Sequence, residues 1–275
     1  MSGTEQEYRL YRDLADWWPL ISPKEEYTAE ARYLAALLAA AGTGIHQVLD
    51  LGSGGGHMAV HLRDDFQVTM VDISAEMLAV SERLNPGSEH IQGDMRSVRL
   101  ARSFDAVLVH DAIDYITTGR DLRQVIDTAY AHCRPGGLAL FVPDYVKDTF
   151  REIAGTGGGG DDGSGRHASF REWTWDPDPA DDWVQAEYEF TLGAVDGTEQ
   201  IIREKHRLGA FSAATWHALL AAAGFTAVSG PEPGTAPSRN ARGAQPAAPG
   251  ALPGTPPEHL FSAWRPPEPG ADRLP

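Results

Sequence analysis

His46-Gln-Val-Leu-Asp-Leu-Gly-Ser-Gly-Gly-Gly-His57 is a short apolar run that leads directly into a glycine-rich turn. The apolar residues predict a buried strand, and a helical pattern resumes from Met58 to Leu62. Gly52, Gly54 and Gly56 let the backbone turn sharply and approach a ligand closely, just before a helix N-terminus that favours negative groups. The stretch therefore predicts a strand, turn and helix that hold an adenosine-type ligand.

Two classes of cofactor site use such a turn. A dinucleotide site needs G-x-G-x-x-G/A from the strand end, and counted from Gly52 the last position is His57, which does not fit. Counted from Gly54 the motif ends at Ala59 and fits, but it then begins beyond the strand end. A D-x-G-x-G-x-G pattern, by contrast, begins at Asp50 inside the strand. A nicotinamide oxidoreductase therefore depends on the later register alone.

A second strand, from Gln67 to Ile73, is expected to end in an acid. Asp72 follows Gly52 by about 20 residues, the spacing at which a strand-end carboxylate accepts hydrogen bonds from ribose hydroxyls. A helix is expected to begin directly afterwards, at Ser74, so the alternative is an acid favoured by the helix dipole. We favour the ribose role.

Strand and helix patterns continue to alternate along the chain. His90-Ile-Gln92 is a short third strand followed by Gly93-Asp94-Met95, and Phe104 to His110 is a fourth. A helical pattern from Leu122 to His132 leads into the Arg134-Pro-Gly-Gly turn, which opens a fifth strand ending at Val142. This alternation predicts an α/β fold with a doubly wound, mostly parallel sheet.

These motifs together resemble those of the class I S-adenosylmethionine (SAM)-dependent methyltransferases. The resemblance implies a Rossmann-like fold with a seven-stranded, mostly parallel sheet whose last two strands form a hairpin. It also implies SAM as the cofactor, with an acid and an apolar residue at the adenine. The residues that we assign to SAM are Asp50, Gly52, Gly54, Gly56, Asp72, Ile73, Asp94, Met95 and His110.

The N-terminal segment, from Tyr8 to Ala31, is rich in tyrosine and tryptophan. It looks like the arm of small-molecule methyltransferases that N-methylate amino sugars in bacterial natural-product pathways, where the arm closes over cofactor and substrate. This likeness implies that Tyr27 lies near the cofactor and that Tyr11 and Trp18 line the substrate pocket. The alternative is that these aromatic side chains only pack the lid.

The methyl group of SAM is already activated by its sulfonium, so the protein mainly aligns donor and acceptor and excludes water. An amine or hydroxyl acceptor must also lose a proton, which favours a histidine or carboxylate nearby. The catalytic candidates are His110 and Asp111, at the end of the fourth strand, and His206, which matches a histidine of the amino-sugar enzymes. Tyr115 and His206 are expected to contact the acceptor. A structural, hydrogen-bonded role is the alternative for each histidine.

The other histidines singled out are expected to be structural or exposed: His57, His61, His132, His167, His217 and His259. Histidines and acids do not fall at metal-ligand spacing, so we predict a metal-independent reaction. The single cysteine, Cys133, allows no internal disulfide and is expected to be a small buried residue.

Beyond Val142 the composition changes. Gly155 to Gly165 is dominated by glycine and predicts a mobile loop. Three alternating segments follow, His167 to Trp175, Trp183 to Leu192 and Gln200 to Ala210, and the short loops between them favour antiparallel pairing. Such an inserted sheet would cover the ligand-binding edge of the main sheet and select the substrate.

A last helix, Ala213 to Ala223, is expected to be capped by Ser212 and closed by Gly224. Phe225 to Ser229 and Glu258 to Trp264 predict the final two strands. The expected organisation is an N-terminal helical lid (1–42), a SAM-binding core (43–150 and 210–265), an inserted antiparallel sheet (151–209) and a disordered loop (230–257).

Composition narrows the classes of partner. The net charge of −16, from 23 basic and 39 acidic residues, argues against nucleic acid as a substrate. The longest apolar run, around Leu37 to Ala41, is too short to span a bilayer, and Met1 to Glu7 lacks the features of a signal peptide. We therefore expect a cytoplasmic enzyme with a small-molecule substrate that needs neither nucleic acid nor membrane, with a homodimer as the candidate assembly.

The leading hypothesis is a SAM-dependent methyltransferase acting on an amine of an amino sugar or another secondary metabolite, as in antibiotic biosynthesis. O-methylation of a small molecule is the second hypothesis. A different class is a methyltransferase-fold protein that binds SAM without transferring the methyl group, such as a cyclase or a binding protein.

Overall fold

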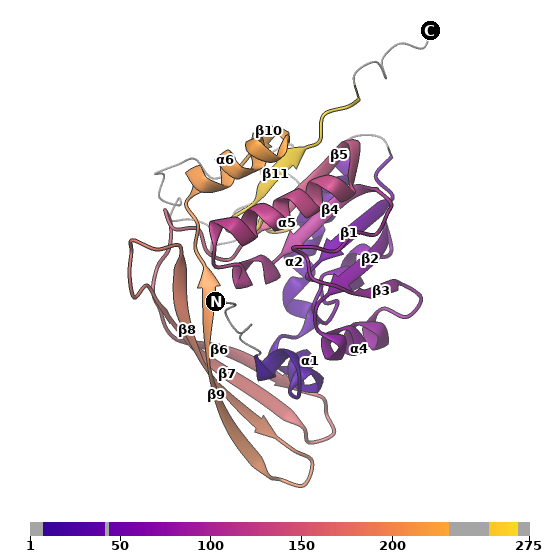
Figure 1. The fold of residues 1–275 in the computed structure, drawn as a ribbon. Coiled ribbons are helices and arrows are strands. Elements are labelled where there is room, and N and C mark those ends of the chain that lie inside the picture. The colour runs from indigo at the N-terminus through magenta and orange to yellow at the C-terminus, as the bar shows by residue number, and fades with distance from the viewer. Residues whose placement is uncertain (1–7, 42–43, 231–252, 269–275) are drawn as a thin grey trace.

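The computed structural model describes residues 8–41, 44–230 and 253–268 (Figure 1). Its main sheet has seven strands in the order β10-β11-β5-β4-β1-β2-β3. Strand β11 runs antiparallel to β10 and β5, and the other neighbouring strands pair in parallel. The predicted sheet and its terminal hairpin are confirmed. The strands are β1 (Gln47–Leu51), β2 (Gln67–Asp72), β3 (Glu89–Gln92), β4 (Phe104–His110), β5 (Cys133–Val142), β10 (Thr226–Ser229) and β11 (Phe261–Trp264).

Helices cover both faces of this sheet, which explains why its central strands read as continuous apolar runs. On one face α5 (Gly119–His132) and α6 (Ala213–Ala223) contribute to one core with β4 and β5. On the other face α2 (Thr28–Ala40) and α3 (Ala59–Leu62) contribute to a second core. Helix α4 (Ala75–Leu84) follows β2 and lies near β3 (Figure 1). Cys133 is fully buried, as predicted.

The second sheet has four antiparallel strands in the order β6-β7-β8-β9. The three alternating segments form β7 (His167–Trp175), β8 (Trp183–Gly193) and β9 (Glu199–Gly209), as predicted. The fourth strand, β6 (Ile153–Asp161), contradicts the prediction of a mobile loop from Gly155 to Gly165, because most of the glycine run pairs with β7. A Cβ on Gly157 would come within 2.0 Å of the Phe170 carbonyl oxygen, so glycine permits this close pairing.

The N-terminal segment consists of short helical turns that lie against the small sheet. They are η1 (Arg9–Tyr11), η2 (Ala15–Trp17), α1 (Trp18–Ile21) and η3 (Lys24–Tyr27). Leu10, Leu14, Leu20 and Ile21 share an apolar core with Phe190, Leu192 and Ile202 of β8 and β9. This packing fixes the segment beside the carboxyl ends of the main strands (Figure 1).

Helix α6 is closed at both ends as predicted. Ser212 Oγ accepts a hydrogen bond from the Thr215 N–H at 3.1 Å, and Gly224 adopts φ +100° at the C-terminus. Most of the segment 230–257, expected to be disordered, lies outside the described residues. Within the described part, the Thr255 N–H donates to the Ala29 carbonyl at 3.0 Å, so this end of the segment is bound to α2. Among the described residues, no helix is long and apolar enough to cross a membrane.

Candidate functional site

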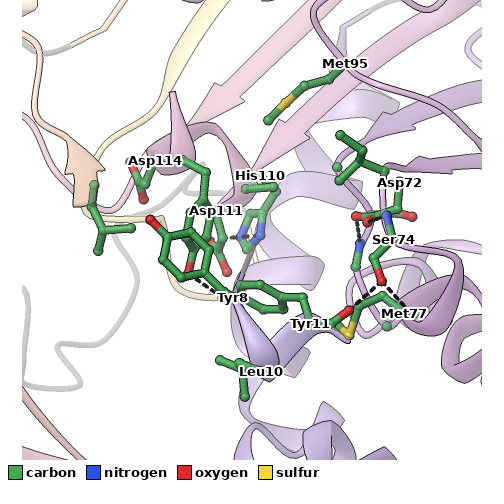
Figure 2. A pocket seen from close by; sticks show the side chains of 18 of the residues that line it. Tyr8, Leu10, Tyr11, Asp72, Ser74, Met77, Met95, His110, Asp111 and Asp114 are labelled. Atoms are coloured by element: carbon green, nitrogen blue, oxygen red, sulfur yellow. Dashed lines mark hydrogen bonds and ion pairs between the residues drawn. The ribbon is translucent and has the colours of Figure 1, made fainter. Parts of the chain in front are cut away.

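A cavity of about 1370 Å³ opens at the carboxyl ends of β1, β2 and β4, beneath the N-terminal segment and beside the small sheet. Its volume exceeds the roughly 300–1,000 Å³ typical of a single small-ligand pocket, so two ligands can lie in it together. Figure 2 shows Asp72 and Ser74 on one side, Asp111 and Asp114 on the other, His110 between them, and Tyr8 and Tyr11 below. The cavity therefore has two chemically distinct ends.

The glycine turn lies at the first end, and its backbone requires glycine. Gly52 has φ +81°, and a Cβ there would come within 2.5 Å of Ala112 Cβ. Gly56 has φ +74°, and its Cβ would approach Ser81 Oγ to 2.2 Å and Asn85 Nδ2 to 2.3 Å. Gly54 lines the cavity, as expected, whereas Gly56 faces α4 and supports the turn from behind.

Asp72 joins the glycine turn to the start of α4. Its Oδ2 accepts the Gly54 N–H at 2.8 Å, and its Oδ1 accepts the Ser74 N–H at 2.9 Å. Burial raises the pKa of Asp72, and these backbone hydrogen bonds oppose that rise. Each carboxylate oxygen keeps a lone pair, so this residue can hold the turn and also accept hydrogen bonds from a ligand's hydroxyl groups.

The expected adenine-binding residues also line this end. Met95 lies against the glycine turn, with its Sδ 3.6 Å from the position of a Cβ on Gly52, and Ile73 is 53% exposed. Asp94 is held by Arg96, whose Nε lies 3.0 Å from Oδ1 and whose Nη2 lies 2.6 Å from Oδ2. An adenine amino group binding here would therefore share Asp94 with Arg96.

His110 separates the two ends and lies between two carboxylates. Its Nε2 is 3.1 Å from Glu30 Oε1, and its Nδ1 is 3.1 Å from Asp111 Oδ1. Burial alone would lower the pKa of His110, but Asp111 and Glu30 outweigh it and raise that pKa well above the usual value. An imidazolium that donates from both nitrogens has no lone pair for a proton. The contacts with Glu30 and Asp111 fit a charge-balancing role for His110, and the base role expected of it stays a prediction.

Asp50 and Asp111 line the cavity on either side of this histidine. Burial raises the pKa of Asp50 to about 7, against the opposing charge of His110. Asp111 has φ +46°, a backbone conformation that residues other than glycine rarely adopt. This strained backbone lies directly at the end of β4, next to the expected reaction centre.

One acid that follows β5, Asp144, joins Asp111 at the cavity and was not predicted from the sequence. Asp144 lines the cavity, and its N–H donates to Oδ2 of the buried Asp114 at 2.9 Å. Burial and then the charge of Asp111 raise the pKa of Asp144 well above its usual range. The sequence could have identified Asp144 by its position, because it follows a strand end just as Asp111 does.

A further acid comes from the small sheet. Glu172 of β7 lines the cavity, and its Oε1 accepts hydrogen bonds from Tyr145 Oη at 2.9 Å and Thr174 Oγ1 at 2.7 Å. Tyr188 Oη lies 3.4 Å from the same oxygen. No local motif marks Glu172, because only the folded sheet brings it to the cavity. The second end is thus lined by carboxylates and tyrosines.

The N-terminal segment closes the cavity from outside, and the structure brings all three of its predicted aromatic residues there. Trp18 Nε1 donates to His57 Nδ1 at 3.0 Å, and the Tyr11 carbonyl accepts from Ser74 Oγ at 2.5 Å. Tyr27 bonds Ser22 at 3.0 Å, with its ring 6.1 Å from that of His110. His57, expected to be structural or exposed, lines the cavity, and burial lowers its pKa to about 4.

Tyr115 lines the cavity as expected, but His206 does not. His206 is fully buried behind Tyr115 and meets the Tyr115 hydroxyl through Nδ1 at 2.9 Å. A direct contact between His206 and a ligand is therefore not what the structure shows.

Of the other histidines, His132 and His259 are buried and hydrogen-bonded, as expected for structural residues. Within the described ranges, no group of three or more histidine, cysteine or acidic side chains is arranged to hold a metal ion.

Comparison with known proteins identifies the central part of the chain. Residues 48–137 match the family described as "Methyltransferase domain". The chain contains a methyltransferase domain. Over 130 residues, 46% of this chain and 55% of the relative, it is 29% identical to a dTDP-3-amino-3,4,6-trideoxy-alpha-D-glucopyranose N,N-dimethyltransferase of Streptomyces venezuelae. The chain thus spans about half the length of the curated relatives it matches.

Solved structures extend the likeness to the whole fold. DesVI of Streptomyces venezuelae superposes with a TM-score of 0.73 at 23% identity, covering 93% of this chain and 97% of DesVI. SAM-bound CalS10, an amino pentose methyltransferase from Micromonospora echinaspora involved in calicheamicin biosynthesis, gives 0.68 at 21% identity, covering 96% and 99% of the two chains. The methyltransferase domain therefore has the class I fold, with the small sheet and the N-terminal segment included in the likeness.

Proposed function

We propose that this protein transfers a methyl group from SAM to an amine on a small molecule, and that the molecule is an amino sugar or a similar secondary metabolite. The observation that carries the proposal is one cavity with an adenosine-type end and a carboxylate-lined end. Relatives whose names specify amino-sugar N-methylation support the choice of acceptor class.

The first end fits SAM. Glycine at position 52 leaves room where a Cβ would collide with Ala112, and Asp72 has free lone pairs for the ribose hydroxyls. Met95 and Ile73 supply apolar surface for the adenine, next to Asp94. When bound, SAM supplies an activated methyl group to a nucleophile approaching in line. Trp18, Tyr11 and Tyr27 cover the cavity and exclude water from that step.

The second end fits a cationic amine. Asp111, Asp144 and Glu172 come from three different elements and line the same cavity. Burial penalises the charged form of Asp144, and a positive ligand stabilises it, which an ammonium group provides and a hydroxyl does not. This difference favours N-methylation over O-methylation.

The test is transfer of an isotope-labelled methyl group from SAM to a matched pair of acceptors. We would use dTDP-3-amino-3,6-dideoxy-α-D-glucopyranose, the compound named for a Streptomyces fradiae relative, and its 3-hydroxy counterpart. We expect label on the nitrogen of the amino sugar and none on the hydroxy compound. Label on the hydroxy compound alone supports O-methylation, and SAM binding without transfer to a wide amine panel supports a non-transferring protein.

From the same relatives we also propose a role in secondary metabolism and antibiotic biosynthesis. A cytoplasmic location, a homodimer and a reaction that needs no metal are proposals as well. The lid, core and inserted-sheet boundaries predicted from the sequence remain our proposed division of the chain.

A further inference from the structure

A chain of hydrogen bonds runs from the cavity into the small sheet. The Tyr11 hydroxyl lies 2.5 Å from the Tyr115 hydroxyl, which lies 2.9 Å from His206 Nδ1. His206 Nε2 in turn lies 2.9 Å from Glu204 Oε2. These four side chains come from η1, η4 (Ala112–Tyr115) and β9, and only Tyr11 and Tyr115 line the cavity. The sequence analysis did not single out Glu204.

This chain of hydrogen bonds is shielded from solvent. His206 has no exposed surface, and the Tyr8 ring lies 3.9 Å from it, centroid to centroid, with the Tyr188 ring at 4.9 Å. Burial raises the pKa of both Tyr11 and Tyr115, so their hydroxyls keep their protons at neutral pH. Each hydroxyl therefore keeps a hydrogen that it can donate within this series of hydrogen bonds.

Glu204 sets the direction of those bonds. Its Oε2 accepts the Leu10 N–H at 3.4 Å, whereas its Oε1 is buried and has no hydrogen-bond partner among the described residues. A proton on Oε1 would thus be an unsatisfied donor, and we take Oε2 as a carboxylate oxygen that accepts from both the Leu10 N–H and His206 Nε2. A carboxylate requires a hydrogen on Nε2 of His206, and with that single hydrogen on the ring Nδ1 keeps its lone pair.

The direction of the bond from His206 fixes the donor and acceptor roles of Tyr115 and then of Tyr11. With a lone pair on Nδ1, the Tyr115 hydroxyl donates to His206, and the Tyr115 oxygen is free to accept from Tyr11. The Tyr11 hydroxyl has then used its only hydrogen. Its oxygen can offer only lone pairs to the cavity, as an acceptor for an N–H group.

We propose that Tyr11, Tyr115, His206 and Glu204 form a relay that takes the proton from the amine acceptor before methylation. This inference rests on the proposed function, because the carboxylates that bind an ammonium group also favour its protonated, non-nucleophilic form. Tyr11 is the residue that touches the acceptor. Tyr115 lines the cavity beside it, and His206 and Glu204 act through Tyr115 as positioning residues.

The proton balance is complete within the chain. The ammonium N–H bond breaks, its electron pair stays on nitrogen, and the proton goes to the Tyr11 oxygen. Tyr11 passes its own hydrogen to the Tyr115 oxygen, and Tyr115 passes its hydrogen to His206 Nδ1. The result is an imidazolium beside the Glu204 carboxylate, both tyrosines neutral and the amine free to attack. The proton returns by the same route to water once the product leaves.

Replacing Glu204 by glutamine should reverse the chain. A side-chain amide can donate to Nε2, which moves the imidazole hydrogen to Nδ1. Nδ1–H then donates to Tyr115, Tyr115 donates to Tyr11, and the Tyr11 hydrogen points into the cavity. Glu189→Gln is the matched control, since Glu189 lies in the same sheet and pairs with Arg203 at 2.6 Å, away from the relay.

The direction is measured without any acceptor by ¹H–¹⁵N correlation spectra of ¹⁵N-histidine-labelled protein, with the His206 signals assigned from His206→Gln. We expect the Nε2–H tautomer in the wild type and in Glu189→Gln, and the Nδ1–H tautomer in Glu204→Gln. An Nδ1–H tautomer or an imidazolium in the wild type at neutral pH, or loss of the Nε2–H tautomer in Glu189→Gln, overturns the relay. A Glu204→Gln protein that does not fold is replaced by Tyr115→Phe, which should shift the His206 Nδ1 resonance by removing its donor.

Turnover with the amino sugar completes the test. Glu204→Gln and Tyr115→Phe should each lower kcat by about a hundredfold, with the Kd for SAM unchanged. Wild-type kcat in both variants overturns the relay while leaving methyl transfer established. Absence of transfer by the wild type overturns the proposed function itself, and with it the role of the relay, whatever the tautomer of His206.

Discussion

The imidazole of His110, which lines the cavity, contacts the carboxylate of Glu30, with Nε2 3.1 Å from Oε1. One residue ends β4 and the other lies in the first turn of α2. With Asp111 on the other ring nitrogen, Glu30 outweighs burial and raises the pKa of His110 above its usual value. This contact joins the core of the sheet to the helix that follows the N-terminal segment.

The contact predicts a pH dependence of stability. The pKa of His110 is raised by folding, so its contribution is fully present below the unfolded value of about 6.5 and is lost as the pH rises through the higher folded value. In Glu30→Gln, the free energy of unfolding should therefore fall less steeply above about pH 6.5 than in the wild type. Urea unfolding across pH measures this, with the exposed Glu25→Gln as control, and equal slopes would argue against a charged His110.

The glycine turn predicts a difference between two alanine substitutions. Gly56 and Gly87 have similar backbone angles, φ +74° and +88°, but a Cβ meets Ser81 and Asn85 at Gly56 and nothing within 4 Å at Gly87. Gly56→Ala should thus be less stable than Gly87→Ala by about 1–3 kcal/mol, the cost of overpacking. Denaturant unfolding gives both values, and equal losses would mean that α4 does not pack on the turn as described.

In the wild type, Trp18 is expected to slow the dissociation of SAM from the cavity. In Trp18→Phe the hydrogen bond to His57 is lost, and SAM should dissociate about three- to tenfold faster, equivalent to roughly 0.5–1.5 kcal/mol. The neighbouring Trp17 does not line the cavity and lies against Arg166, so Trp17→Phe is the control. A chase of labelled SAM with unlabelled SAM measures both rates. Identical rates in the two variants would leave the segment no role in retention.

Glu172 predicts selectivity for the acceptor. Glu172→Gln keeps the size of the side chain and its hydrogen-bonding oxygen but removes the charge at the second end of the cavity. The KM for the amino sugar should rise about tenfold or more, the range of a hydrogen bond to a charged group, while SAM affinity stays constant. Glu187→Gln, on the neighbouring strand and paired with Lys205, is the control. A parallel loss of SAM affinity would place Glu172 at the wrong end of the cavity.

The fold was predictable from the sequence where local pattern and tertiary structure agree. The strand, glycine turn and helix from Gln47 to Leu62 and the caps at Ser212 and Gly224 depend on short-range backbone requirements, and they appear as expected. The glycine run at 155–165 failed because composition alone suggests flexibility. Its hydrogen bonds come from β7, which was itself predicted as a strand, but nothing in the composition of the glycine run shows that it pairs with that strand.

The residues of the site also fall into those that the sequence predicts and those that only the fold brings together. Asp72, Asp111 and the glycines are marked by their positions at strand ends, a signal that sequence carries. Glu30, Glu172 and Glu204 reach the site only through helix and sheet packing, so no spacing rule identifies them. His206 was found by resemblance, but whether it lines the cavity or lies behind Tyr115 depends on the depth of β9, which one sequence does not specify.

The central claim is that the glycine turn and Asp72 hold SAM, and calorimetric titration tests it most directly. Wild type and the exposed-loop control Asp64→Ala should bind SAM equally, and Asp72→Ala should bind it more weakly by about 1.5–3 kcal/mol, with no binding of NAD to any of them. SAM binding by Asp72→Ala as tight as that of the wild type, or binding of NAD in place of SAM, would contradict the claim.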